Sequence, residues 1–396
     1  MSEFAGKHIL IIVENLPAPF DRRVWQEATA LDDKGAKVSI ICPKMKGYTK
    51  SFESIDGIDI YRHYLPFEGS GPLGYLWEYS CSLFFELFLA WKIFIKKRFH
   101  VIHGCNPPDL IFLIALFFKP FKVKYIFDHH DINPELYIAK YGKKGFFYNL
   151  MVFLEKMTFR FSDYSIATNE SYKSIAISRG GMNPNNVQVV RSGPSLNRLK
   201  IQSPNSRFKN GKRFLVGYLG VIGDQEGIDL LLRSVQWLRE RRDDFCVGIV
   251  GGGTSLEKLK NLSVDMGLDD IVTFYGRVSD QVLLDVLNTA DVCVNPDVPT
   301  EMNNLSTMNK IMEYMALKKP IVQFDLKEGR FSAQKASLYA SGASIEDFGG
   351  KMEELLDSAS LRQEMGEFGY QRVVNELSWE YEKTNLFSIY RKIFND

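Results

Sequence analysis

Residues 303–325 read Asn-Asn-Leu-Ser-Thr-Met-Asn-Lys-Ile-Met-Glu-Tyr-Met-Ala-Leu-Lys-Lys-Pro-Ile-Val-Gln-Phe-Asp, which predicts a helix followed by a strand. Apolar residues recur in the first part at i, i+3, i+4 and i+7, the spacing that places them on one face of a helix. The run from Pro320 to Phe324 is short and mostly apolar, as in a buried strand. The apolar helix face comprises Met308, Ile311, Met312 and Met315.

The opposite face of this helix is polar and carries Ser306, Asn309, Lys310 and Glu313. Ser306 or Thr307 is expected to cap the N-terminus, which leaves backbone N–H groups beside a cation. N–H groups, helix dipole and cation together favour a phosphate group. Glu313, one turn further on, is placed to accept hydrogen bonds from a ribose. The alternative is a solvated polar face on an ordinary helix.

The residues before this helix alternate between strands and helices in the same way. The expected strands are Phe214–Leu219, Phe245–Val250, Ile271–Tyr275 and Val292–Asn295. Two strand-to-helix turns are rich in glycine, at 220–227 and 251–253, but Leu256 stands where a G-x-G-x-x-G dinucleotide motif needs its third glycine. We therefore expect a doubly wound parallel sheet, then helices near 345–357 and 359–375. A last amphipathic helix from Trp379 to Phe394 is expected to pack back on the first domain.

The N-terminal half opens with the same alternation. A strand at His8–Val13, a helix at Asp21–Lys34 and a strand at Lys37–Cys42 predict a second parallel sheet, with ligands at the carboxyl ends of its strands. Arg22 and Arg23 lie in the first helical turn, where the dipole disfavours cations. This mismatch indicates anion binding for Arg23, whereas Arg22 is interpreted as a surface residue.

A dense polar cluster follows the expected strand that begins at Tyr125. Within eight residues the chain carries Asp128, His129, His130, Asp131 and Glu135. Contact with the substrate or the reacting atoms is the favoured interpretation, and a structural hydrogen-bond network is the second. Metal binding by His129, His130 and Asp131 is the third, although neighbours in an extended chain point to opposite faces.

Residues 73–99 are aromatic on nearly every side of a helix and end in Lys96-Lys97-Arg98. Either this helix is buried between layers, or part of it lies on a membrane surface with its cations toward anionic lipid. Residues 143–161 form a second segment rich in Phe, Tyr and Lys. We expect no transmembrane helix, because no span of 18 apolar residues lacks charge.

Length and composition bound the remaining possibilities. A chain of 396 residues is too long for one ordinary core. Its formal net charge of +1 gives no strong field for nucleic acid, which we do not expect as a partner. The five scattered cysteines are interpreted as buried free thiols of a reducing compartment. A polar break predicts domains at 1–195 and 213–375, with a linker at 196–212 and a C-terminal helix at 376–396.

Several stretches occur in the order typical of one enzyme family. They are Asp21-Arg-Arg-Val-Trp-Gln-Glu-Ala, Asn106-Pro-Pro-Asp, Asp128-His-His-Asp-Ile-Asn-Pro-Glu-Leu-Tyr, Gly220–Gly227, Val250-Gly-Gly-Gly, Phe274-Tyr-Gly-Arg-Val and Asn309-Lys-Ile-Met-Glu-Tyr-Met-Ala-Leu-Lys-Lys-Pro. With them the chain resembles the retaining GT-B glycosyltransferases of glycosyltransferase family 4, of the bacterial surface-polysaccharide type. The resemblance implies two Rossmann-like domains that face each other across a cleft.

The resemblance also implies roles for single residues. The second domain would bind a nucleoside diphosphate sugar, with Glu313 on the ribose, and the first would bind the acceptor. The expected catalytic residues are His130, Asp131 and Lys310. The expected donor-binding residues are Gly220, Gly223, Gly251, Gly252, Arg277, Asn295, Asn303, Ser306, Thr307, Asn309, Lys310 and Glu313. The expected acceptor-binding residues are Arg23, Asn106, Asp109 and Glu135.

Three positions depart from the family pattern. Leu305 stands where the first Glu of the E-x7-E pattern is expected, and Glu301, Asn303 or Asn304 would have to replace it. Val221 and Glu226 stand where the family has an Arg and a Lys on the diphosphate. Lys310 is the expected replacement for this pair.

The predicted activity is retaining transfer of a sugar, from a UDP-sugar first and a GDP-sugar next, to a glycan or lipid-linked acceptor. It is expected to serve cell-surface polysaccharide or lipopolysaccharide synthesis, in the cytoplasm or at the inner face of the cytoplasmic membrane, with membrane contact through residues 73–99 and 143–161. No cofactor is expected, and because the sequence has no Asp-x-Asp, no metal. The alternatives are a sugar-nucleotide epimerase of the same architecture and a catalytically inactive nucleotide-sugar-binding partner subunit.

Overall fold

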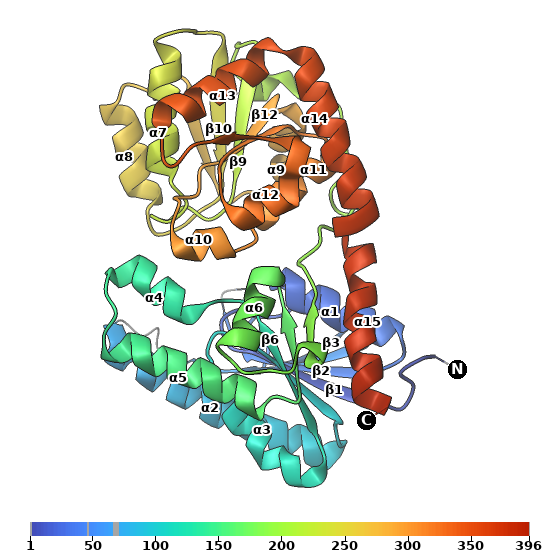
Figure 1. Cartoon of the computed structure of the whole chain (residues 1–396). Helices are drawn as coiled ribbons and strands as arrows, with labels where there is room; N and C mark the ends of the chain where they lie inside the picture. Colours follow the sequence, from blue (N-terminus) through green and yellow to red (C-terminus); the bar gives the residue numbers. More distant parts are fainter. Residues whose placement is uncertain (1, 46, 66–70, 396) are drawn as a thin grey trace. The chain divides into compact units, whose positions relative to one another are not determined.

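The computed structural model describes residues 2–45, 47–65 and 71–395. The chain forms two compact units: unit 1 contains Met1–Ser192 and Glu382–Asp396, and unit 2 contains Gly193–Tyr381. Each unit is built on a β-sheet with helices on both of its faces (Figure 1). The two α/β domains predicted from the alternation of strands and helices are thus confirmed.

Unit 1 has an eight-stranded sheet in the order β3-β4-β2-β1-β5-β6-β7-β8. Neighbouring strands are parallel except β3, which runs antiparallel to β4 at one edge. Every residue of β1 is buried, as expected for a parallel strand covered on both faces. The strands are β1 (His8–Val13), β2 (Lys37–Pro43), β3 (Phe52–Ile55), β4 (Ile58–His63), β5 (Val101–Cys105), β6 (Lys124–His129), β7 (Tyr164–Ala167) and β8 (Val187–Val189).

The helices of unit 1 include one from the end of the chain. The carboxylate of Asp21 caps the first helix by accepting a hydrogen bond from the Val24 N–H at 3.1 Å. The C-terminal helix α15 (Trp379–Asn395) packs Phe387, Tyr390 and Phe394 around Phe4, which confirms its predicted return to the first domain. The other helices are α1 (Arg22–Asp33), α2 (Gly71–Lys96), α3 (Phe112–Phe118), α4 (Asn133–Tyr141), α5 (Phe146–Phe161) and α6 (Glu170–Ser178).

Unit 2 has a six-stranded, fully parallel sheet in the order β11-β10-β9-β12-β13-β14. The strand order reverses between β9 and β12, and open α/β sheets bind ligands at the carboxyl ends beside such a point. The strands are β9 (Phe214–Leu219), β10 (Phe245–Val250), β11 (Val272–Gly276), β12 (Val292–Asn295), β13 (Ile321–Phe324) and β14 (Ser337–Ala340).

The helix of the 303–325 stretch is α11, and its N-terminal cap differs from the prediction. Residues Glu301–Leu305 form a separate short helix, α10, whose C-cap is Ser306, and the Ser306 hydroxyl donates to the Met302 carbonyl at 2.8 Å. Neither Ser306 nor Thr307 therefore caps α11; Met308 occupies the N-cap and makes no side-chain cap bond. The predicted apolar face is confirmed in that Ile311, Met312 and Met315 are fully buried.

The other helices of unit 2 surround its sheet. They are α7 (Ile228–Arg239), α8 (Leu256–Asp265), α9 (Asp280–Thr289), α11 (Asn309–Ala316), α12 (Lys327–Ala333), α13 (Ile345–Asp357) and α14 (Ala359–Arg372). A π-helical turn at Val373–Leu377 follows α14, so the helix expected at 359–375 ends in a different geometry.

Helix α2 exposes several large apolar side chains. Its inward side buries Ser82 and Glu86 together with Ala90, Ile93 and Phe94, whereas other large apolar side chains project outward. The outward residues are Trp77, Phe84, Phe88 and Ile95, with exposed fractions of 59%, 68%, 61% and 80%. The helix is thus neither fully buried nor an ordinary surface helix. In the described parts of the chain, no helix is long and apolar enough to cross a membrane.

Candidate active site

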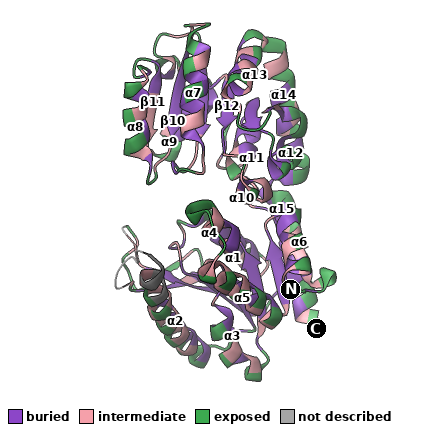
Figure 2. Cartoon of the chain, turned by 60° about the vertical axis from the view of Figure 1, so that its left-hand side comes forward, coloured by how far each residue is buried: buried purple, intermediate pink, exposed green. Residues whose placement is uncertain are grey.

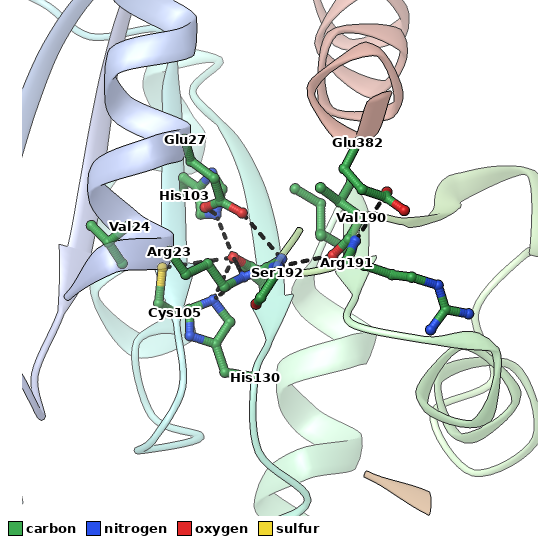
Figure 3. Close-up of polar contacts among 12 residues, drawn as sticks. Arg23, Val24, Glu27, His103, Cys105, His130, Val190, Arg191, Ser192 and Glu382 are labelled. Carbon is green, nitrogen blue, oxygen red and sulfur yellow. Dashed lines mark hydrogen bonds and ion pairs between the residues drawn. The ribbon is translucent and has the colours of Figure 1, made fainter. Parts of the chain in front are cut away.

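The polar residues predicted in unit 1 gather around a buried guanidinium group. Arg23 lies in the first turn of α1 and donates to Asp128 from Nη2 at 2.9 Å and from Nε at 3.3 Å. Its Nη1 donates to the Val190 carbonyl at 2.9 Å and the Ser192 hydroxyl at 3.3 Å, so the guanidinium joins α1 to the end of β6 and to the segment after β8 (Figure 3). Glu27, one turn along α1, is 3.0 Å from Nη2. These internal contacts occupy the arginine that was predicted to bind the acceptor.

Asp128, at the end of β6, is the carboxylate that organises this cluster. Its Oδ2 lies 2.5 Å from Nε2 of His130 and 3.1 Å from Nε2 of His103. Burial opposes ionisation, but Arg23, His130 and the hydrogen bonds outweigh it and hold the pKa of Asp128 well below its usual range. The sequence placed Asp128 in the polar cluster without giving it a role, because its partners come from α1 and β5.

The ionised Asp128 fixes the protons of both histidines. A carboxylate only accepts hydrogen bonds, so Nε2 carries the proton in His103 and in His130. Nδ1 of His103 then accepts a hydrogen bond from the Tyr390 hydroxyl of α15 at 2.8 Å. Nε of Arg23 lies 3.0 Å from Nε2 of His130 and donates to the same carboxylate at 3.3 Å. His130 is 14% exposed, and its Nδ1 is left as the ring nitrogen that can meet a ligand.

Asn106, which follows β5, holds the backbone that carries His130 and Asp131. Its Oδ1 accepts from the His130 N–H at 2.6 Å and the Asp131 N–H at 3.1 Å, and its Nδ2 donates to the Asp131 carbonyl at 2.7 Å. Nδ2 also donates to Asp109 at 2.8 Å, and burial raises the pKa of Asp109 to about 6. Burial raises the pKa of Asp131 as well. Asn106 and Asp109, predicted to bind the acceptor, thus support the turn that carries His130.

Two other residues of the predicted polar cluster lie apart from His130. Glu135 forms a bidentate ion pair with Arg179, at 2.5 and 3.1 Å. His129 is fully buried, 3.6 Å from Glu155 and packed against Phe159. His129, His130 and Asp131 therefore do not converge as metal ligands.

The described residues contain two sets of three groups whose ligand atoms lie within 4.8 Å of one another: His103, Cys105 and Asp128, and Glu27, Asp128 and His130. Both sets include Asp128, whose oxygens already face Arg23 and two histidines. A cation there would lie beside a buried guanidinium, so these residues do not fit a metal ion.

In unit 2, the glycine-rich turns after β9 and β10 are joined by backbone hydrogen bonds. The Gly220 N–H donates to the Val250 carbonyl at 3.0 Å, and the Gly251 N–H donates to the Gly276 carbonyl at 2.9 Å. A Cβ on Gly251 would lie 1.7 Å from the Gly220 carbonyl oxygen, so only glycine fits there. Gly252 lies against Arg277, because a Cβ added to it would be 3.0 Å from Cγ of that arginine. The predicted residues Gly220, Gly251, Gly252 and Arg277 are thus brought together.

Lys310 lies directly against this group of glycines. A Cβ on Gly220 would be 3.1 Å from Cε of Lys310, and Nζ lies 5.0 Å from the centre of the Tyr218 ring. Nζ also donates to Asp297, two residues after β12, at 2.9 Å. Burial opposes the charge on Lys310, but Asp297 outweighs it and raises its pKa. We call Gly220, Gly251, Gly252, Arg277 and Lys310 the donor edge; Asp297, which the sequence did not single out, is its buried counter-charge.

The other predicted donor-binding residues have varied surroundings. The Asn303 amide donates to the Gln225 and Val298 carbonyls, both at 2.9 Å, and holds the loop before α10. The Gly223 N–H donates to Glu226 at 3.1 Å. Neither amide atom of the buried Asn295 has a hydrogen-bond partner among the described residues. Thr307 is half-buried, Asn309 is exposed, and Glu313 pairs with Arg198.

Comparison with known proteins gives matches in both units. Residues 21–198 match the family described as Glycosyltransferase Family 4, and residues 213–358 match that described as Glycosyl transferases group 1. A GDP-mannose-dependent alpha-(1-6)-phosphatidylinositol monomannoside mannosyltransferase of Mycobacterium tuberculosis is 28% identical over 180 residues, 44% of this chain and 46% of that protein. The chain thus aligns with about half the length of this curated relative.

Longer alignments are more distant in sequence. The capsular polysaccharide biosynthesis glycosyltransferase CapM of Staphylococcus aureus is 24% identical over 76% of this chain and 78% of that protein. The sucrose-phosphate synthase of Thermosynechococcus elongatus superposes with a TM-score of 0.80 over 98% of this chain and 99% of its own, at 17% identity, and shows the fold. One family match in each unit, in chain order and on this fold, places the chain among the GT-B glycosyltransferases.

Proposed function

We propose that the chain transfers a sugar from a nucleoside diphosphate sugar to a glycan or lipid-linked acceptor, with retention of the anomeric configuration. We further propose that this transfer serves the synthesis of a cell-surface polysaccharide or lipopolysaccharide. The observation that carries the proposal is the donor edge of unit 2, where glycine backbone and a lysine that is only 10% exposed meet beside the reversal of strand order. The family matches in both units support it.

The donor edge would act on the leaving diphosphate. Negative charge develops there as the glycosidic bond breaks, and charges placed in advance stabilise it without reorganisation. In this proposal Lys310 and nearby backbone N–H groups face the diphosphate, and Glu313 accepts hydrogen bonds from the ribose. The pairing of Lys310 with Asp297 keeps the ammonium in place before the donor arrives.

In unit 1, His130 would orient the reacting sugar or the acceptor. With its Nε2 proton held by Asp128, its Nδ1 would contact the donor sugar or the acceptor hydroxyl. Asp131, the next residue, would orient the acceptor. The proposed attack is on the front face, and the donor phosphate takes the acceptor proton, so the cluster orients groups and supplies no strong base.

The proposal also specifies the nucleobase of the donor and the absence of a metal requirement. UDP is our first choice and GDP the second, and the name of the mycobacterial relative, which specifies GDP-mannose, is the reason to test both. We propose that no metal takes part, because the sequence has no Asp-x-Asp and Lys310 supplies a cation for the diphosphate.

The proposal is tested by nucleoside diphosphate release from UDP- and GDP-sugars in the presence of a bacterial membrane lipid extract. Lys310→Ala should lower the release rate by about 10²- to 10³-fold, because it removes the cation from the leaving group. Glu313→Ala should mainly raise KM. Lys318→Ala is the matched control, because Lys318 follows the same helix but pairs with Glu367 on the surface. Undiminished release by both site variants would refute the site; donor binding without release would favour the inactive partner subunit.

We also propose that unit 1 contacts a membrane that presents the acceptor. The outward residues of α2 are spaced as one helical face, and Figure 2 shows exposed positions along α2, α3 and α5. Leu113 and Phe117 of α3 and Phe146 and Phe153 of α5 are further exposed apolar residues of unit 1. We call these four residues together with Trp77, Phe84, Phe88 and Ile95 of α2, eight in all, the aromatic face. Large exposed apolar surfaces mark interaction sites, and a helix lies on a membrane through such a face.

Charge beside the aromatic face favours an anionic lipid surface as its partner. Lys92, Lys96, Lys97 and Arg98 are exposed at the C-terminal end of α2, and Lys143 and Lys144 are exposed just before α5. Cations near anionic lipid contribute about 1 kcal/mol each. This arrangement supports a peripheral position at the inner face of the cytoplasmic membrane, where a lipid-linked acceptor would be reached.

A further inference from the structure

The segment that enters unit 2 carries an arginine that the sequence did not single out. Arg198 belongs to a turn in which its own N–H and that of Leu199 donate to the Ser195 carbonyl, at 3.1 and 3.0 Å. Leu199 is 3% exposed and packs, with Leu196, into the core formed by α9 and α11. The backbone of Arg198 is thus fixed on unit 2, and its side chain lies where α9 and α11 meet.

The guanidinium of Arg198 joins these two helices. Its Nη2 pairs with Oε1 of Glu313 on α11, and its Nη1 lies 3.7 Å from a carboxylate oxygen of Asp280, in the first turn of α9. Arg198 is 22% exposed and Glu313 15%, so a ligand can approach the pair from solvent. Nη1 is buried, makes no hydrogen bond within the described ranges and faces the Asp280 carboxylate, so the guanidinium is held between two acidic side chains.

The ion pair between Arg198 and Glu313 is what electrostatics requires if this site binds an anion. Glu313, which would hold the ribose, carries a negative charge. The nucleoside diphosphate would bring two or more further negative charges close to it. A like charge weakens binding unless a cation offsets it. A fixed partner also keeps the carboxylate in one orientation, so that less entropy is lost when the ribose binds.

We propose that Arg198 is a positioning residue of the nucleoside site: it neutralises Glu313 and fixes its carboxylate as the acceptor for the ribose hydroxyls. This inference rests on the proposed function, because it assigns Glu313 to a nucleotide. It also gives the site a cation in addition to Lys310.

Calorimetric titration of the full chain with UDP, GDP and their 2′-deoxy and 3′-deoxy analogues tests this assignment. Arg198→Ala should weaken binding of the preferred ribonucleotide by roughly 10- to 100-fold, because it removes a charge-assisted hydrogen bond and exposes the Glu313 charge. It should also reduce the preference for the ribonucleotide over its deoxy analogues. Glu313→Gln in the Arg198→Ala background should recover part of the affinity, because the uncompensated charge is then gone.

Arg207→Ala is the matched control, since Arg207 is 63% exposed and pairs with Asp285 nearby in unit 2. It should leave both affinity and ribose preference unchanged, and thermal unfolding should show that all variants are folded. Nucleotide binding that depends on Glu313 but not on Arg198 would overturn the inference. Loss that Glu313→Gln does not relieve would also overturn it, because Arg198 would then contact the nucleotide directly. No binding of any nucleotide by the unaltered chain would instead refute the proposed function.

Discussion

Glu14, just after β1, shows how one buried acid can make stability depend on pH. Its carboxylate is 3% exposed and accepts a hydrogen bond from the Ser82 hydroxyl of α2 at 2.8 Å. Burial raises its pKa to about 7, and the pKa of neighbouring Glu86 is also raised by burial. The folded state therefore holds protons that the unfolded chain releases near pH 4.5. The stabilisation that the Glu14 carboxyl group contributes is therefore fully present below pH 4.5 and is lost as the pH rises through 7.

Glu14→Gln is expected to remove this dependence. The unaltered chain should lose roughly 3 kcal/mol relative to the variant between pH 4.5 and 7, because one pKa unit corresponds to about 1.4 kcal/mol. Burial lowers the pKa of nearby His63 to about 4, which adds stability as the pH rises, so the difference between the two proteins must be measured. Urea unfolding of both proteins between pH 4.5 and 7 gives this difference in the free energy of unfolding. A difference that is flat with pH, as expected for the surface control Glu240→Gln, would contradict the assignment.

At single residues, the sequence could name candidates but not their partners. His130 and Lys310 were named as candidates because their residue types stand out beside a strand end or a helix start, and their roles stay predictions. Asp128 was seen without a role, and Asp297 was not singled out, because each becomes important through residues distant in the chain: Arg23 for one and Lys310 for the other. Which polar side chains are buried beside such a partner is decided by the fold, and a sequence pattern does not report it.

For helices and strands, the spacing of apolar residues predicted the buried face correctly, whereas the residue that caps a helix was predicted incorrectly. The strand at His8–Val13 and the burial of Ile311, Met312 and Met315 are confirmed, because apolar spacing reports directly on burial. The cap of α11 was wrong, because Ser306 also suits the end of a preceding helix, and α10 competes for it. For α2 the expectation of a helix buried between layers was only partly right, since its inner side is buried and its outer side is exposed. The alternative of membrane contact stays a prediction.

The exposed apolar side chains of helix α2 lead to a prediction about binding to membranes. Phe84→Ser with Phe88→Ser should reduce cosedimentation of the full chain with vesicles of phosphatidylglycerol and phosphatidylcholine by at least about 10-fold, because burying each Phe contributes about 1.5–3 kcal/mol. Both residues are more than 60% exposed, so the fold should be unaffected. Ile201→Ser, an exposed apolar residue of unit 2, is the control. Binding should weaken with salt and without phosphatidylglycerol; a chain that never sediments with vesicles would contradict the membrane contact.

For the whole molecule, the two-domain α/β fold followed from the repeated alternation of strands and helices. The antiparallel β3 and the edge strand β14 were not predicted, because short edge strands carry little apolar pattern. The return of the C-terminal helix to unit 1 was predicted from its amphipathic pattern. Its Tyr390 was not, because the hydrogen bond to His103 joins residues 287 positions apart.

Our main proposal for unit 2 is that its donor edge binds a nucleoside diphosphate. The decisive experiment measures the thermal unfolding midpoint of the full chain with UDP or GDP, and with uridine or guanosine as ligands that lack the diphosphate. A ligand that binds only the folded state stabilises it by about 2.7 kcal/mol at a concentration of 100 Kd. We predict a concentration-dependent rise with one diphosphate, little with its nucleoside, and a much smaller rise in Lys310→Ala. No rise with either diphosphate, or an equal rise in Lys310→Ala, would contradict the account.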